Sequence, residues 1–315
     1  MKHIALLFCC LQFSLLAAAK KNATLYFPPT KGEWARIDPA KVGWSPPKLK
    51  KLMDYAGKNK SSGVIILYRG RILAEQYWPL NPPEKNPNGQ RNPYFHMRLG
   101  KDAKGRAIED VASAQKSVTA MLVGIAQHKG LLKIEDHVYK YLGKGWSKAP
   151  AAAEGKITIR HLITMSSGLN PRLQYVAPAG TKWFYNTGAY SKSLTCVSKA
   201  AKMDANELTK KWLSGPLGMN DSRWAVRPWQ TSVRTDANRY GFATTARDLA
   251  RFGLLMLANG YWENKNVIED KDYLKAAISP SQKLNPSYGY LWWLNGGPFV
   301  ARAGGQKKQG RLIFG

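Results

Sequence analysis

The chain is poor in acidic residues. It has 20 Asp and Glu against 48 Lys and Arg, which gives a formal net charge of +28. Such an excess favours association with an anionic partner. The basic residues are scattered and form no nucleic-acid-binding motif, so we expect no nucleic acid partner. An anionic cell-envelope polymer or membrane surface better suits the N-terminal segment described below.

Cysteine and histidine are also scarce. Of the 3 cysteines, Cys9 and Cys10 lie near the N-terminus, and only Cys196 follows them. If Cys9 and Cys10 leave with the N-terminal segment described below, the single remaining cysteine cannot form an internal disulfide. The helical pattern around Cys196 favours a buried apolar role over a catalytic one. The 5 histidines show no metal-ligand spacing, and we expect neither a metal nor another cofactor.

The N-terminal apolar run is too short to span a membrane comfortably. It extends from Ile4 to Leu16, after the basic start Met1-Lys2-His3 and before Ala17-Ala18-Ala19. A basic start, a short apolar core and an Ala-x-Ala site are typical of a secretory signal peptide. We therefore expect residues 1–19 to be removed after Ala19. Residues 20–315 would then form one domain in the periplasm or outside the cell.

Ser113-Ala114-Gln115-Lys116 places a serine and a lysine one helical turn apart on the same face. Serine alone is a poor nucleophile, and the lysine amine can take its proton. The apolar stretch from Val118 to Ala126 predicts a buried helix that begins near Ser113. Backbone N–H groups at such a helix start favour negative charge. A second Ser-x-x-Lys, Ser45 to Lys48, is better explained as an N-cap followed by proline.

Tyr185 is the second chemical candidate, in a loop from Pro178 to Gly188. A tyrosine can act as a base when a nearby cation lowers its pKa from about 10, and Lys116 could be that cation. The structural alternative is that the ring packs and the hydroxyl makes one hydrogen bond.

The predicted elements come as a hairpin, then a helical block, then strands. We expect a helix at Pro46–Lys58, a hairpin over 63–78 turned by Arg69-Gly70, and a loop over 79–106. Further helices are expected over 113–142 with a break at Gly130, and over 157–165, 187–203, 206–213 and 245–258. Further strands are expected over 288–295, 299–302 and 311–314. This order predicts an α+β fold with one mixed antiparallel sheet flanked by helices, an all-helical lobe, and a ligand cleft between the two.

Four segments together resemble the serine β-lactamase and penicillin-binding protein superfamily, for which Ser-x-x-Lys is a signature. They are Ser113–Asp136, His161–Leu169, Pro178–Tyr190 and Tyr240–Gln306. The closest likeness is to class C-like serine hydrolases, the group with family VIII carboxylesterases and 6-aminohexanoate-dimer hydrolase. The resemblance runs from about residue 40 to the end of the chain.

The resemblance implies a β-lactamase/transpeptidase-like fold and an acyl-enzyme reaction. Ser113 would attack the carbonyl of a small or peptide-like ester or amide, while Lys116 and Tyr185 shuttle its proton. The backbone N–H groups of Ser113 and Gly305 would form the oxyanion hole. Substrate contacts are implied for Thr187, Arg302, Ala303 and Gly304.

Two departures from the family pattern stand out. Thr187 occupies the third position of the family's Tyr-x-Asn motif, with Asn186 one residue early. This favours ester over β-lactam hydrolysis, and a non-catalytic binding or sensor protein is the alternative function. Relatives also continue past Gly304-Gly305-Gln306 with two further strands and a long helix. We therefore expect the C-terminal strand and helix to be missing and the edge at Val64–Leu67 to be open.

Overall fold

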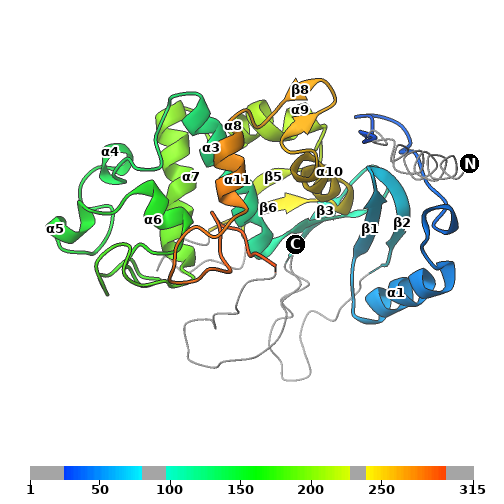
Figure 1. Cartoon of the computed structure of the whole chain (residues 1–315), viewed down its shortest axis with the longest axis horizontal. Coiled ribbons are helices and arrows are strands. Elements are labelled where there is room, and N and C mark those ends of the chain that lie inside the picture. Colours follow the sequence, from blue (N-terminus) through cyan, green and yellow to red (C-terminus); the bar gives the residue numbers. More distant parts are fainter. Residues whose placement is uncertain (1–24, 80–96, 228–238, 296–315) are drawn as a thin grey trace, which may run out of the picture.

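The N-terminal part folds as a helix followed by a hairpin. A computed structural model describes residues 25–79, 97–227 and 239–295 (Figure 1). After a short 3₁₀ turn, η1 (Ala40–Val42), helix α1 (Pro46–Lys58) has the predicted bounds. The side chain of Ser45 accepts a hydrogen bond from the N–H of Lys48, as expected for an N-cap before proline.

The predicted hairpin is confirmed as β1 (Gly63–Tyr68) and β2 (Arg71–Tyr77), paired antiparallel. Gly70 in its turn has φ of 85°, which favours glycine. A Cβ atom there would lie 1.7 Å from the carbonyl oxygen of Tyr26, so the N-terminal segment also requires glycine at this position.

A four-stranded antiparallel sheet forms the centre of the molecule, in the order β3-β4-β6-β5. Its strands are β3 (Arg98–Lys101), β4 (Ala107–Asp110), β5 (Arg223–Val226) and β6 (Tyr240–Thr244). The prediction of a loop over 79–106 is wrong at β3. β3 pairs with its near neighbour β4, with Arg98 opposite Glu109, and β4 in turn pairs with the distant β6, with Asp110 opposite Ala243.

The described strands form three separate sheets instead of the single expected one. The third is a short hairpin of β7 (Tyr261–Trp262) and β8 (Lys265–Asn266). Within the described residues β1 pairs with β2 alone. The strands expected over 299–302 and 311–314, and with them the expected C-terminal edge, lie outside the described residues.

The prediction of a strand over 288–295 is wrong, because this segment forms no regular strand. Only an isolated bridge joins Tyr288 to Trp293. Leu291 between them has φ of 62°, a left-handed conformation that no regular strand accommodates. Its N–H donates to the carbonyl of Ile163 at 2.9 Å, so this segment follows the helical lobe instead of a sheet.

The helical lobe surrounds α3 (Gln115–His128), whose residues from Val118 to Ala126 are buried. A helix that is apolar on all sides belongs inside a protein, and α7 and α11 pack against it (Figure 1). Most of the predicted helices are confirmed, although the one expected after Gly130 shrinks to α4. The other helices are η2 (Ala112–Ala114), α4 (Tyr139–Leu142), α5 (Ala151–Glu154), α6 (Ile159–Ile163), α7 (Thr187–Ala201), α8 (Ala205–Thr209), the π-helical turn η3 (Lys210–Ser214), α9 (Gly215–Leu217), α10 (Ala246–Leu257) and α11 (Lys271–Ala277). Within the described part of the chain, no helix combines the length and apolarity needed to cross a bilayer.

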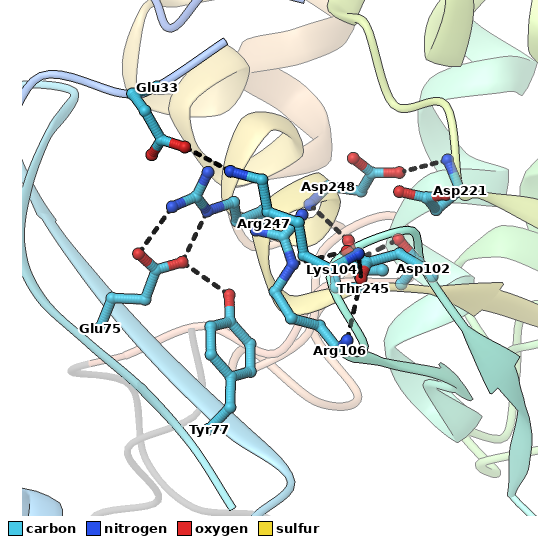
Figure 2. A network of polar contacts seen from close by, with 11 residues as sticks. Glu33, Glu75, Tyr77, Asp102, Lys104, Arg106, Asp221, Thr245, Arg247 and Asp248 are labelled. Carbon is cyan, nitrogen blue, oxygen red and sulfur yellow. Dashed lines mark hydrogen bonds and ion pairs between the residues drawn. The ribbon is translucent and has the colours of Figure 1, made fainter. Parts of the chain in front are cut away.

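An ion-pair network fastens the hairpin to α10 (Figure 2). The carboxylate of Glu75 on β2 accepts hydrogen bonds from Arg247 at 2.6 and 2.8 Å, and one from the Tyr77 hydroxyl at 2.7 Å. Burial alone would raise the pKa of Glu75, but these donors hold it below its usual value. Arg36 binds the same carboxylate, so Glu75 joins three segments of the chain.

Asp248, in the first turn of α10, makes stability depend on pH. Its Oδ2 accepts from the Asp221 N–H and from the Ser222 hydroxyl, each at 2.9 Å. Burial raises its pKa from the usual 3.8 to about 6. The folded state therefore binds the proton more tightly than the unfolded chain. The contribution of protonated Asp248 to the free energy of unfolding is fully present below pH 3.8 and is lost as the pH rises through 6.

Asp248→Asn is expected to raise the free energy of unfolding at pH 7 by about 1–3 kcal/mol. The amide oxygen can keep both hydrogen bonds without a buried charge. At pH 4 the gain should disappear, because both forms are then neutral when folded. Urea denaturation at the two pH values measures this, with exposed Asp54→Asn as the control. A gain of equal size at both pH values would contradict the assignment.

Candidate active site

Ser113 lies at a sharp turn from β4 into α3. Ala112, directly before it, has φ of 47°, a strained conformation for a residue other than glycine. The Asp110 carboxylate holds this turn by accepting from the Ala112 N–H at 2.8 Å. Asp110 is itself held by Arg227 through two hydrogen bonds of 2.5 and 3.0 Å, both side chains being buried. The predicted helix start near Ser113 is therefore the 3₁₀ turn η2, which leads into α3. The Ser113 side chain is exposed there.

Lys116 lies directly beneath the serine and is only 3% exposed. Its Nζ is 3.4 Å from Ser113 Oγ, in position to donate a hydrogen bond. The same Nζ is 4.7 Å from the centroid of the Tyr185 ring and 4.3 Å from that of Tyr190. The structure therefore places the Lys116 amine within 3.4 Å of the Ser113 hydroxyl and beside the rings of Tyr185 and Tyr190.

Tyr185 belongs to an aromatic cluster that the sequence did not reveal. Its ring stacks on Trp293 at 5.8 Å and meets Tyr288 edge-on at 6.3 Å. Trp183 contacts both Tyr288 and Trp293, at 5.5 and 5.8 Å. These contacts fix the Tyr185 ring beside Lys116. In the sequence, the high aromatic content of 288–295 is the signal for this cluster, and it is equally typical of a strand.

The two residues after Tyr185 have different surroundings. Asn186 is 1% exposed and caps α7 by accepting from the Ala189 N–H at 3.1 Å. Its amide also donates to the carbonyls of Leu169 and Asn170, at 2.8 and 3.0 Å. The Asn186 amide is therefore engaged in holding the loop. Thr187 is the first residue of α7 and is half-buried.

Gln115 and Tyr190 are further residues that the sequence analysis missed. The Gln115 amide donates to the Tyr190 hydroxyl at 2.5 Å, and its oxygen accepts from Phe242 N–H at 2.9 Å and from Arg227 at 3.2 Å. Burial raises the pKa of Tyr190 to about 12, so its hydroxyl stays protonated at neutral pH. Gln115 thereby connects the start of α3 to α7, β6 and the Asp110–Arg227 pair.

Four expected site residues cannot be placed. Arg302, Ala303, Gly304 and Gly305 lie outside the described residues, as does the expected signal peptide, residues 1–19. In the part of the chain that the structure describes, no group of three or more His, Cys, Asp or Glu is arranged to hold a metal ion.

His161 and Cys196, which could in principle be reactive, both have surroundings typical of a structural role. His161 accepts a hydrogen bond from the Thr158 N–H through Nδ1 at 3.1 Å, and burial lowers its pKa. Cys196 is buried in α7, as predicted, and burial raises the pKa of its thiol to about 12. Neither side chain contacts Ser113 in the hydrogen bonds of the described residues.

The comparisons with known proteins agree with this geometry. The sequence matches the beta-lactamase family over residues 49–314. An uncharacterised protein of Alkalihalophilus pseudofirmus is 26% identical over 270 residues, which cover 78% of this chain and 73% of that protein.

Solved structures are similar in fold at low sequence identity. The octameric penicillin-binding protein homologue of Pyrococcus abyssi gives a TM-score of 0.55 at 17% identity, covering 78% of this chain and 64% of that one. FmtA of Staphylococcus aureus gives 0.56 at 16% identity, covering 91% and 84%. Together with the family match, this likeness shows that the chain belongs to the beta-lactamase family, whose members are generally hydrolytic serine enzymes.

Proposed function

We propose that this protein is an exported serine hydrolase that cleaves an ester or amide bond through an acyl-enzyme on Ser113. One observation carries the proposal: the buried Lys116 Nζ lies 3.4 Å from the exposed Ser113 Oγ. A lysine amine at that distance can act as the base that activates the hydroxyl. Family membership supports the same class of reaction.

In the proposed reaction, Ser113 Oγ forms a bond to the substrate carbonyl carbon as its proton passes to Lys116 or Tyr185. The carbonyl oxygen becomes an oxyanion, stabilised by the Ser113 N–H at the helix start and, by the family resemblance, by that of Gly305. The proton then goes to the leaving alcohol or amine as its bond to carbon breaks. Water, deprotonated by the same groups, releases the acid and restores Ser113.

An ester is the preferred substrate in this proposal. The Asn186 amide is occupied by two carbonyls and by the helix cap, and Thr187 supplies an alcohol where the family pattern has an amide. A site without that amide is less suited to β-lactams. The net charge of +28 supports an anionic substrate or surface, and the proposed export would place it in the cell envelope.

Fluorophosphonate labelling tests the nucleophile directly. A stoichiometric adduct on the peptide that contains Ser113, identified by mass spectrometry, is expected. The matched control is Ser117→Ala, which removes a hydroxyl one turn further along the same helix, bonded to the Leu291 carbonyl at 3.4 Å. This control should label as the parent protein does. No adduct, with no turnover of p-nitrophenyl esters, would favour the non-catalytic binding or sensor protein.

Tyr185→Phe is expected to lower kcat for p-nitrophenyl esters by about 10- to 100-fold. The change keeps the ring beside Lys116, Tyr288 and Trp293 but removes the hydroxyl that shuttles the proton. Stopped-flow measurement of acylation should show the loss in kcat and not in KM. Exposed Tyr175→Phe is the control. Unchanged kcat would mean that Tyr185 only packs, and that Lys116 acts alone.

A further inference from the structure

A cavity lies beside the candidate active site, between α3, α7, α8 and strands β5 and β6. Its volume is about 600 Å³, within the range of small-molecule sites. Ser113, Lys116 and Tyr185 do not line it. We call it the α7–α8 pocket, and the proposed reaction assigns it no role.

The floor of the α7–α8 pocket is formed in advance. Gln115, Tyr190 and Trp224 lie there, and all three are buried. Gln115 and Tyr190 bond to each other, and the Trp224 indole donates to the Thr209 hydroxyl at 2.9 Å. Because these polar groups already have partners, the floor offers a ligand mainly the small exposed parts of the Tyr190 and Trp224 rings.

The wall of the pocket carries excess positive charge. Lys192 on α7 and Arg239 before β6 both line it. The acidic lining residue, Asp204, caps α8 by accepting from the N–H groups of Asn206 and Glu207 at 2.8 and 3.0 Å. Aromatic floor and cationic wall together fit an anion with a flat apolar body.

We propose that the α7–α8 pocket binds a small aromatic carboxylate and that its occupancy changes the reactivity of Lys116. The link is short. Tyr190 lines the pocket, and its ring lies 4.3 Å from Lys116 Nζ. Gln115, the residue before Lys116, holds the Tyr190 hydroxyl at 2.5 Å. A ligand that contacts these two side chains therefore acts on Lys116 without occupying the space around Ser113. This second half of the inference rests on the proposed function.

Binding is tested by titrating 2-naphthoate into the Ser113→Ala protein in a calorimeter, so that catalysis plays no part. One molecule per chain is expected, with the neutral 2-naphthamide binding at least tenfold more weakly. The double variant Lys192→Gln/Arg239→Gln should bind 2-naphthoate at least tenfold more weakly than the Ser113→Ala protein does. Lys199 is an exposed lysine of the same helix outside the pocket, and Lys199→Gln should change the affinity for 2-naphthoate less than twofold. Equal affinity in the two variants would overturn the pocket assignment.

The coupling is tested in the parent protein with a p-nitrophenyl ester. Saturating 2-naphthoate is expected to change kcat at least twofold, and the Lys192→Gln/Arg239→Gln protein should keep its basal kcat but lose the response. Purely competitive inhibition, or loss of binding after Ser113 is blocked with a fluorophosphonate, would place the ligand at Ser113 and overturn the inference. If the protein has no esterase activity, the calorimetry still decides whether the pocket binds the anion.

Discussion

Ser113→Ala is expected to lower ester turnover by about 10⁶-fold, the scale of loss when a serine hydrolase loses its nucleophile. The side chain is exposed at the start of α3, and its oxygen is the atom that would bond to the acyl group. Lys116 Nζ, the candidate base, lies 3.4 Å from this oxygen. The acyl-enzyme therefore cannot form, and turnover should fall close to the uncatalysed rate.

The loss should be chemical and not structural. Because Ser113 is exposed and lies in a 3₁₀ turn, its replacement by alanine leaves no cavity in the core. Melting temperatures within about 2 °C of the parent protein are expected. Ser117→Ala serves again as the matched control, with turnover close to that of the parent. Retention of more than a few per cent of turnover by purified Ser113→Ala would move the nucleophile elsewhere.

Lys116→Met is expected to lower kcat by about 10²–10⁴-fold, the usual contribution of a positioned acid or base. Methionine is chosen because it fills much of the buried space between Tyr185 and Tyr190 without a titratable group. The expected loss is in kcat, since Lys116 lies beneath Ser113 and reaches the reaction through its hydroxyl. Burst kinetics with a p-nitrophenyl ester separate acylation from deacylation.

The pH profile distinguishes a catalytic amine from a packing residue. If Lys116 moves the proton, the variant should lose one limb of the pH dependence of kcat/KM as well as activity. Lys199→Met, an exposed lysine of α7 outside the α7–α8 pocket, is the control for removal of one positive charge. An unchanged profile with unchanged turnover in Lys116→Met would assign the proton transfer to another group.

Local sequence signals predicted the elements that depend on neighbours in the chain. Ser45 with two prolines located the start of α1, and Arg69-Gly70 located the turn of the first hairpin. The spacing of Ser113 and Lys116 predicted their contact, because one helical turn separates them whatever surrounds the helix. These features are decided within a few residues.

The features that the sequence did not reveal depend on distant partners. Gln115 and Tyr190 are far apart in the chain, and no spacing rule relates them. The segment with Tyr288 and Trp293 has strand-like composition, but the contact of Leu291 with Ile163 in the helical lobe gives it another path. Tertiary packing overrode propensity there.

The buried thiol of α7 has a practical consequence for measuring motion. If the first 19 residues are removed, Cys196 is the one thiol left in the chain. It is 0% exposed, and burial raises its pKa to about 12, so a disulfide reagent at neutral pH meets no thiolate in the closed fold. The rate at which such a reagent modifies the protein then reports how often the helical lobe opens. The same rate measurement can show whether 2-naphthoate, or an acyl group on Ser113, slows that opening.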